Sequence, residues 1–100
     1  MRRDQRFFYV YILANQRNGT IYIGVTNNLY PRVLAHRSGD GSIFTRHYGV
    51  YMLVHYEQFA SISDAIQRET NLKRWPRKWK LDLIEKDNPH WRDLWVDLVN

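Results

Sequence analysis

The sequence predicts a mixed α/β (α+β) domain, in which a small three-stranded antiparallel sheet starts with a hairpin and is flanked by helices. Three observations predict this fold class. Two strand-like runs lie on either side of Asn18-Gly19, and a third such run starts near residue 51. The remaining segments begin and end with residues that are typical of helix termini. At 100 residues the chain is long enough for one hydrophobic core. We therefore expect a single domain over residues 1–100, with its core at about 7–85.

The hairpin is predicted from Asn18-Gly19, because both residues tolerate the positive φ that a two-residue type I′ turn needs. The strands then run over about 7–15 and 20–26, with Leu13 facing Gly24 across the pair. Side chains alternate between the faces of a sheet, so one face is wholly apolar and the other carries tyrosines. The apolar face holds Phe8, Val10, Ile12, Ala14, Ile21, Ile23 and Val25, and the opposite face holds Tyr9, Tyr11, Leu13, Asn15, Tyr22, Gly24 and Thr26.

Gly24 on the tyrosine face has two interpretations. A residue without a side chain, flanked by hydroxyl groups, suits the close approach of a ligand to the sheet. Tyrosines are also ordinary strand residues and need no ligand. The hairpin alone leaves both interpretations open.

A helix is expected directly after the hairpin. Asn27 or Asn28 can cap it, and Pro31 falls in its first turn, where the missing N–H of proline is harmless. This helix runs to about Ser38. The glycine-rich stretch 38–42 then predicts a mobile connector near the site.

The second half of the chain predicts one more strand and three more helices. The strand covers about 51–59, and a helix follows over 61–74, between a Ser-rich start and Pro76. A short helix is expected over 77–86. The last helix, at about 89–98, is expected to be amphipathic and to dock on the core, because its large apolar residues repeat at i, i+3, i+4 and i+7: Trp91, Leu94, Trp95 and Leu98.

Composition narrows the class of protein. The chain has no cysteine, which excludes disulfides, zinc–thiolate sites and thiol nucleophiles. No apolar run approaches the ~20 residues of a membrane span, so a cytoplasmic protein is the default expectation. The net charge is +5, and residues 68–80 alone hold six basic side chains against Glu69. A basic surface of this kind favours a polyanionic partner, most often nucleic acid.

Glu69 breaks the pattern of its helix. It falls at helical spacing among the apolar residues Ile62, Ala65, Ile66 and Leu72, so we expect it to face inward. Burial of a carboxylate is costly unless the group is paired or binds a metal. An ion pair, with Lys73 one turn later or with a distant arginine, and metal coordination both remain open.

Arg32 and His36 form a second unusual pair, on the helix after the hairpin. Leu29 and Val33 make its apolar stripe, His36 continues that stripe, and Arg32 borders it four residues earlier. A guanidinium offers a planar fork suited to phosphate oxygens, and an imidazole exchanges a proton near neutral pH. A histidine at the end of a helix is also commonly structural.

Taken together, these residues resemble the GIY-YIG nuclease domain, which occurs in excision-repair nuclease subunits, homing endonucleases and structure-specific junction nucleases. The resemblance covers about residues 7–85 and is greatest to small, free-standing members. Tyr9-Val10-Tyr11 stands where the family has Gly-Ile-Tyr, and Tyr22-Ile23-Gly24 is an intact second motif. Arg32 matches the catalytic arginine, His36 the His/Tyr position and Glu69 the metal-binding glutamate.

The chain departs from the family pattern at three positions. Tyr9 replaces the first glycine, and Val25 stands where a lysine is common. Leu81 lies near the place of an asparagine that often follows the glutamate, with Lys80 and Thr45 as candidate substitutes.

The resemblance implies a metal-dependent endonuclease that hydrolyses DNA phosphodiester bonds, is structure-selective or weakly specific, and acts in DNA repair or recombination. Glu69 would hold Mg²⁺ or Mn²⁺, and Arg32 would stabilise charge on the phosphoryl group. A tyrosine would position and deprotonate the water, and His36 would take the proton or orient the hydroxyl. The catalytic set is Tyr11, Tyr22, Arg32, His36 and Glu69.

The expected partner is DNA, branched and single-stranded forms included, with RNA and a protein partner left open. Basic residues neutralise phosphates, and an exposed tryptophan can stack on an unpaired base. We expect at least one of Trp75 and Trp79 to lie in the core. The alternative function is a nucleic-acid-binding module with the same fold and little activity. The residues expected to contact nucleic acid are Arg37, Lys73, Arg74, Arg77, Lys78 and Lys80.

Overall fold

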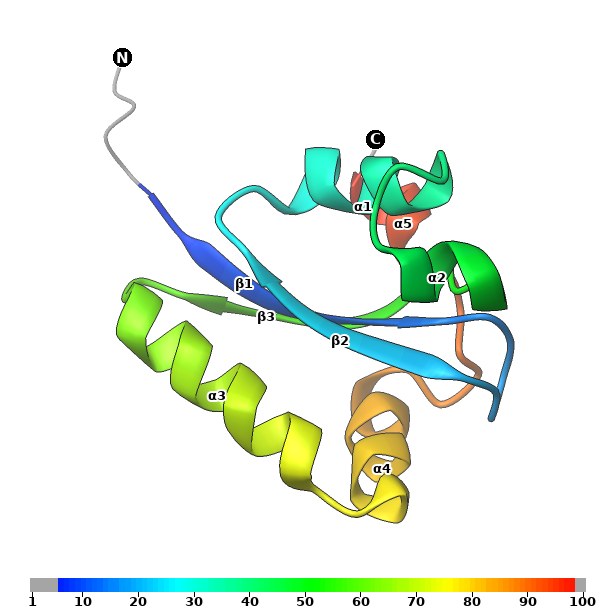
Figure 1. Cartoon of the computed structure of the whole chain (residues 1–100). Helices are drawn as coiled ribbons and strands as arrows, with labels where there is room; N and C mark the ends of the chain where they lie inside the picture. The colour runs from blue at the N-terminus through cyan, green and yellow to red at the C-terminus, as the bar shows by residue number, and fades with distance from the viewer. Residues whose placement is uncertain (1–5, 99–100) are drawn as a thin grey trace.

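The computed structural model describes residues 6–98, and its architecture confirms the predicted fold class. Three antiparallel strands form one sheet in the order β2-β1-β3 (Figure 1). Helices cover both faces, with α1, α2 and α5 on one side and α3 and α4 on the other. The elements are β1 (Phe8–Ala14), β2 (Ile21–Thr26), α1 (Leu29–Arg37), α2 (Ile43–Tyr48), β3 (Met52–Phe59), α3 (Ile62–Arg74), α4 (Arg77–Asp87) and α5 (Trp95–Leu98).

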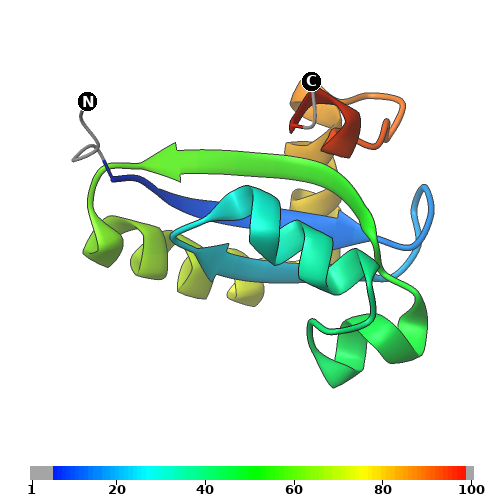
Figure 2. The ribbon, with the colours of Figure 1, turned by 90° about the horizontal axis from the view of Figure 1, so that it is seen from above.

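The central strand β1 separates two hydrophobic clusters. The first, on the face covered by α3 and α4, contains Val10, Ile12, Ala14, Ile23, Val54, Ala65, Leu72, Ile84 and Trp91. The second, on the face covered by α1, contains Tyr11, Leu13, Leu29, Val33, Val50 and Leu53. Figure 2 shows α1 lying over the sheet on this second face. Residues 10–14 are buried throughout, so β1 is rigidly placed to carry a site.

The predicted register of the hairpin is wrong by two residues. Tyr22 pairs with Leu13 and Gly24 pairs with Tyr11, because the connection is longer than the expected two-residue turn. Its N–H···O=C bonds run from Asn15 to Thr20 and from Gly19 to Gln16. A shift by an even number of residues leaves every side chain on its predicted face.

Side-chain contacts explain the longer turn. The Asn15 side chain accepts a hydrogen bond from the Thr20 N–H at 2.9 Å, which closes the wider loop. From α4, Arg77 donates to the carbonyls of Asn18 and Gly19 at 2.8 and 2.6 Å. Only Asn18 has positive φ among residues 16–19, whereas a type I′ turn needs two such residues.

The predicted C-terminal helix over 89–98 is wrong for residues 89–94, because only α5 is helical. Trp91 has a φ of 57° and packs into the first cluster, whereas Leu94, Trp95 and Leu98 pack against the second. The spacing typical of an amphipathic helix instead belongs to a segment that passes around the edge of β3. It contacts the core on both faces of the sheet.

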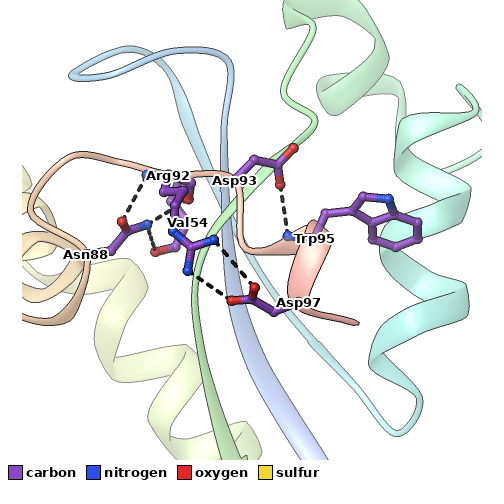
Figure 3. A network of polar contacts seen from close by, with 6 residues as sticks. All are labelled: Val54, Asn88, Arg92, Asp93, Trp95 and Asp97. Atoms are coloured by element: carbon purple, nitrogen blue, oxygen red, sulfur yellow. Dashed lines mark hydrogen bonds and ion pairs between the residues drawn. The ribbon is translucent and has the colours of Figure 1, made fainter. Parts of the chain in front are cut away.

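Polar contacts hold this segment on β3 (Figure 3). The Asn88 amide donates to the carbonyls of Val54 and Arg92 at 3.1 and 2.8 Å. Asp93 accepts from the backbone N–H groups of Leu53 and Trp95 at 3.1 and 3.0 Å. The segment thereby satisfies backbone groups at an edge that would otherwise invite further strand pairing.

Within residues 6–98 we find no helix with the length and apolar character that crossing a membrane requires.

Candidate active site

The strands β1 and β2 and the helix α1 bring four of the five predicted catalytic residues together where α1 crosses the sheet. Tyr11 and Tyr22 lie on neighbouring strands and on the same face of the sheet, with ring centroids 6.3 Å apart. Arg32 and His36 are one turn apart on α1, which crosses this face. The His36 ring lies 5.8 Å from the ring of Tyr11 and 5.2 Å from that of Tyr22.

His36 is fully buried and uses both ring nitrogens. Its Nε2 lies 2.9 Å from the Tyr11 hydroxyl, and its Nδ1 lies 3.0 Å from the Thr45 hydroxyl. Burial, assisted by the nearby charge of Arg32, lowers the pKa of His36 to about 4. The imidazole is therefore neutral at pH 7, where it accepts a hydrogen bond well and a full proton poorly.

Tyr11 is only 1% exposed, and its hydroxyl also accepts a long hydrogen bond, of 3.4 Å, from the Arg32 Nε–H. Burial is the main cause that raises the pKa of Tyr11 to about 12, against the lowering effect of Arg32. Hydrogen bonding to Tyr11 in turn raises the pKa of Arg32. At neutral pH the site therefore presents a neutral phenol beside a fixed positive charge.

Glu69 lies on α3 with its side chain 16% exposed, and it forms the expected ion pair with Lys73, at 2.9 Å. Lys73 is 54% exposed, so this is a pair at the surface. The Glu69 charge also acts on Tyr11: after burial, it is among the causes that raise the pKa of that phenol. The carboxylate is thus paired with Lys73, and its charge acts on Tyr11 from a helix that covers the other face of the sheet.

The predicted apolar stripe of α3 is only half correct. Ala65 and Leu72 are buried, but Ile62 and Ile66 are about half exposed, at 51% and 48%. The inward face is completed by Arg68, which binds Glu57 of β3 through Nε and Nη2 at 2.8 and 2.9 Å. The Arg68 guanidinium therefore holds α3 against the sheet by a polar contact, which the spacing of apolar residues does not predict.

Of the two interpretations of Gly24, the structure supports the structural one, because the ring of Tyr11 fills the space beside this residue. A Cβ at residue 24 would lie 2.5 Å from both the Cζ and the hydroxyl oxygen of Tyr11. The glycine is therefore needed for packing within the hairpin: it lets the ring lie across β2 and reach His36.

Gly24→Ala is accordingly expected to lower the free energy of unfolding by about 1–3 kcal/mol, because the new methyl group overlaps a buried ring. Chemical denaturation measures the effect. In the Tyr11→Leu background the cost of the alanine should shrink, since the colliding ring is gone. An equal cost in both backgrounds would show that Tyr11 is not what the glycine accommodates.

Sequence reasoning missed α2 and its part in the site. Ser42 and Thr45 form a capping box at the start of this helix, and Thr45 contacts His36. Gly41 packs against the His36 ring so closely that a Cβ there would overlap the ring. The Ser42-x-x-Thr45 spacing after a glycine-rich stretch is the signal that would have predicted a helix start.

A hollow of about 340 Å³ lies beside β2, next to Tyr22. Aromatic, aliphatic and basic side chains line it: Ile21, Tyr22, Ile23, Phe44, Lys73 and Lys80. A larger hollow, of about 660 Å³, lies at the other end of α1 between Tyr9, Tyr30 and Tyr56, and none of the five predicted catalytic residues lines it.

The six basic residues predicted to bind nucleic acid have different surroundings. Lys73 and Lys80 line the 340 Å³ hollow, and Arg74 is exposed between them in sequence. Lys78 forms an exposed i,i+4 pair with Asp82. Arg77 holds the hairpin turn, as described above.

Arg37 contacts the C-terminal segment. It donates to Asp93 at 2.8 Å and to the Tyr51 carbonyl at 3.1 Å, and its guanidinium stacks over Trp95 at 5.0 Å. These contacts account for Arg37 without a nucleic acid. Of the two tryptophans in the basic segment, Trp75 packs against the first cluster, as expected of at least one of them, and Trp79 is 55% exposed.

Known proteins are similar to this chain in sequence, and one solved structure is similar to it in fold. A model of the GIY-YIG catalytic domain matches residues 7–82. A UPF0213 protein from Oceanobacillus iheyensis is 42% identical over 77 residues, which cover 77% of this chain and 88% of that protein. A UPF0213 protein from Bacillus pumilus is 38% identical over 96 residues, covering 90% and 94%. The solution NMR structure of a UPF0213 protein from Bacillus halodurans is similar, with a TM-score of 0.55 and 31% identity, covering 87% of this chain and 92% of that one.

Proposed function

This chain belongs to the GIY-YIG family of nuclease domains, and from that membership we propose that it is a metal-dependent endonuclease that hydrolyses DNA phosphodiester bonds. The observation that carries the proposal is the convergence of Tyr11, Tyr22, Arg32 and His36, with the charge of Glu69 within electrostatic reach of Tyr11. This set combines a phosphate-binding cation, two hydroxyls and a carboxylate. Selectivity for DNA structure rather than sequence, and a role in repair or recombination, are part of the same proposal.

Arg32 is the phosphate-binding group. Its Nε is used by Tyr11, while the side chain as a whole is exposed to solvent, so a phosphoryl group can reach the guanidinium. The contact with Tyr11 fixes the orientation of the fork before substrate arrives. A preorganised cation of this kind stabilises the charge that develops on the non-bridging oxygens.

Glu69 is the residue that would hold a divalent cation. Within residues 6–98, no cluster of three or more His, Asp or Glu side chains is suited to bind a metal without other ligands. A single carboxylate fits Mg²⁺ or Mn²⁺, since Mg²⁺ commonly uses one or two carboxylates and takes its other ligands from water and substrate phosphates. When bound, the cation would supply charge stabilisation at the phosphate and the leaving oxygen.

The tyrosine hydroxyls are the groups that orient the attacking water. Tyr11 keeps its proton at neutral pH while its pKa is about 12, so it acts as a base only where an added positive charge lowers that pKa. His36, with a pKa of about 4, is suited to orient the Tyr11 hydroxyl rather than to take its proton. Tyr22 is partly exposed and lines the hollow beside β2, where solvent reaches it.

The hollow beside β2 is the proposed path of the DNA backbone. Lys73 and Lys80 line it and Arg74 is nearby in sequence, so the path carries positive charge next to Tyr22. Such residues bind phosphates in a salt-dependent manner without reading sequence. We leave Arg37 and Arg77 out of this interface, because both are engaged in contacts within the fold.

A nucleic-acid-binding module with little activity of its own is the second candidate. Tyr9, Val25 and Leu81 favour it, since they stand where the family has its first glycine, commonly a lysine and often an asparagine.

Cleavage and binding on one set of labelled substrates distinguish the two functions. Single strands, flaps, nicked duplexes and branched duplexes are incubated with the full chain and Mg²⁺ or Mn²⁺, and binding is measured in parallel in EDTA. We expect cleavage of at least one structured substrate that depends on the metal. Binding without cleavage on every substrate would favour the second candidate.

A further inference from the structure

His36 is engaged at both ring nitrogens, so the direction of its two hydrogen bonds depends on which nitrogen carries the proton. Tyr11 lies on one side at 2.9 Å and Thr45 on the other at 3.0 Å. Each hydroxyl can donate or accept. The surrounding contacts decide between the two arrangements.

The decision starts at Arg32, which can only donate. Its Nε–H points to the Tyr11 oxygen, so that oxygen is an acceptor and the Tyr11 hydrogen needs an acceptor of its own. Tyr11 is 1% exposed, and among the described residues its other hydrogen-bond partner is His36 Nε2. Since buried donors are almost always satisfied, Nε2 must carry a lone pair, and the proton of the neutral ring is on Nδ1.

The same counting continues to Thr45 and Ser42. The Nδ1–H of His36 donates to the Thr45 hydroxyl, whose own hydrogen donates to the Ser42 carbonyl at 3.1 Å. The Ser42 hydroxyl also lies 3.2 Å from the Thr45 oxygen, as a further donor to it. With the proton on Nδ1, the side-chain hydrogens of Tyr11, His36 and Thr45 in these contacts each have an acceptor. The reverse direction would leave the buried Tyr11 hydroxyl without one.

We propose that Thr45 is a positioning residue of this site: its hydroxyl accepts the Nδ1–H of His36 and so stabilises the ring form that Arg32 and Tyr11 require, in which Nε2 faces the Tyr11 O–H and the remaining lone pairs of Tyr11 face Arg32. Thr45 acts through His36 and not on the substrate itself. The effect on cleavage rests on the proposed function. The effect on the imidazole does not.

Thr45 is itself fixed by its surroundings, as this role requires. It is 1% exposed, its backbone N–H donates to the Ser42 hydroxyl at 3.1 Å, and the Ser42 N–H donates to its hydroxyl at 3.2 Å. Gly41, in the same loop, packs against the His36 ring, and a larger residue there would overlap the ring. The connector and α2 therefore form a rigid support for one imidazole.

The test of the positioning role is the tautomer of His36, read by ¹⁵N NMR of histidine-labelled protein at pH 7. We expect the Nδ1–H form in the wild type and in Thr45→Ser, which keeps the hydroxyl. Thr45→Val keeps the shape and removes the hydroxyl, so we expect the Nδ1–H signature to be lost or mixed. An Nε2–H ring in the wild type, or an unchanged Nδ1–H ring in a folded Thr45→Val protein, would overturn the proposal.

If Thr45→Val does not fold, Thr45→Ala gives the same test, because it also removes the hydroxyl. In cleavage assays, Thr45→Val is expected to lower kcat by about 10- to 100-fold with little change in KM, and Thr45→Ser to restore most of it. An unchanged kcat in a folded Thr45→Val enzyme would contradict the catalytic consequence. A wild type that shows the Nδ1–H ring but cleaves nothing would refute the proposed function and leave the assignment of Thr45 standing.

Discussion

Glu69→Gln is expected to lower the rate of DNA cleavage by at least about a hundredfold while leaving the fold intact. The substitution keeps the size and hydrogen-bonding shape of the side chain and removes the charge that would hold a divalent cation. Loss of the pair with Lys73 has little effect on stability, because an exposed i,i+4 pair contributes only a few tenths of a kcal/mol. Single-turnover rates at saturating protein, with Mg²⁺ or Mn²⁺, measure the effect.

Lys73→Ala is the matched control, because it breaks the same ion pair from the other side and leaves the carboxylate in place. At saturating protein we expect it to retain most of the cleavage rate while weakening binding, since Lys73 lines the hollow beside β2. If the two variants were equally impaired in the rate, Glu69 would act as the partner of Lys73 and not as a metal ligand.

Glu57→Gln is expected to lower the free energy of unfolding at pH 7 by about 3 kcal/mol. Burial alone would raise the pKa of Glu57, but hydrogen bonds from His55 and the Arg68 fork, together with their charges, lower it from 4.5 to about 2. The contacts are short, at 2.8 Å from His55 and 2.8 and 2.9 Å from Arg68. A change of one unit in pKa corresponds to about 1.36 kcal/mol, so the lowered pKa of Glu57 corresponds to about 3 kcal/mol of stability.

The pH dependence follows from the direction of the change in pKa. A carboxyl group whose pKa is lowered by folding stabilises the protein fully above its unfolded value of 4.5, and this contribution is lost as the pH falls from 4.5 towards 2. The difference in stability between wild type and Glu57→Gln should therefore be full at pH 7 and shrink over this range. Urea denaturation at pH 7, 4 and 3 measures it.

Asp82→Asn serves as the control for Glu57, because it removes a carboxylate that is paired with Lys78 but exposed to solvent. We expect a change within about 0.5 kcal/mol at pH 7. A loss at Glu57 no larger than the loss at Asp82 would show that the network with His55 and Arg68 does not stabilise the fold.

Much of the fold could be predicted from sequence because its signals are local. Strand alternation assigned each residue of the hairpin to the correct face, and Ser61 and Pro76 bounded the helix that became α3. The register of the hairpin could not be predicted from Asn18-Gly19, because Arg77, 58 residues away from Gly19, helps to hold the turn. Alternation of side chains along a strand determines the face that each side chain occupies, but it permits a two-residue shift of the register.

The C-terminal segment shows where periodicity fails. Trp91, Leu94, Trp95 and Leu98 have helical spacing, but Trp91 enters one hydrophobic cluster and the other three pack against the second. The pattern arises from a chain that passes around the edge of β3. The decisive contacts, such as the Leu94 N–H to the Leu53 carbonyl at 2.7 Å, join residues about 40 positions apart, beyond the reach of a sequence window.

Within the site, the sequence could predict which residues take part but not the contacts between them. The resemblance to the GIY-YIG domain predicts Tyr11, Tyr22, Arg32 and His36, and the fold brings these four residues together. That Gly24 accommodates the ring of Tyr11 follows from a register that the sequence did not specify. The sequence suggests Thr45 only as a substitute for a missing asparagine. The helix α2 is six residues long and too short for periodicity to reveal it, so its capping box is its local signal.

The most direct test of the central claim compares the wild type with Arg32→Ala in a single-turnover cleavage reaction started by adding Mn²⁺ or Mg²⁺. Arg32 is exposed and joins the tyrosines to the position proposed for the phosphate, so its removal should disable the site without unfolding the chain. The account predicts metal-started cleavage by the wild type and a rate at least about a hundredfold lower in a folded Arg32→Ala protein. Cleavage that continues at the wild-type rate in Arg32→Ala would contradict it.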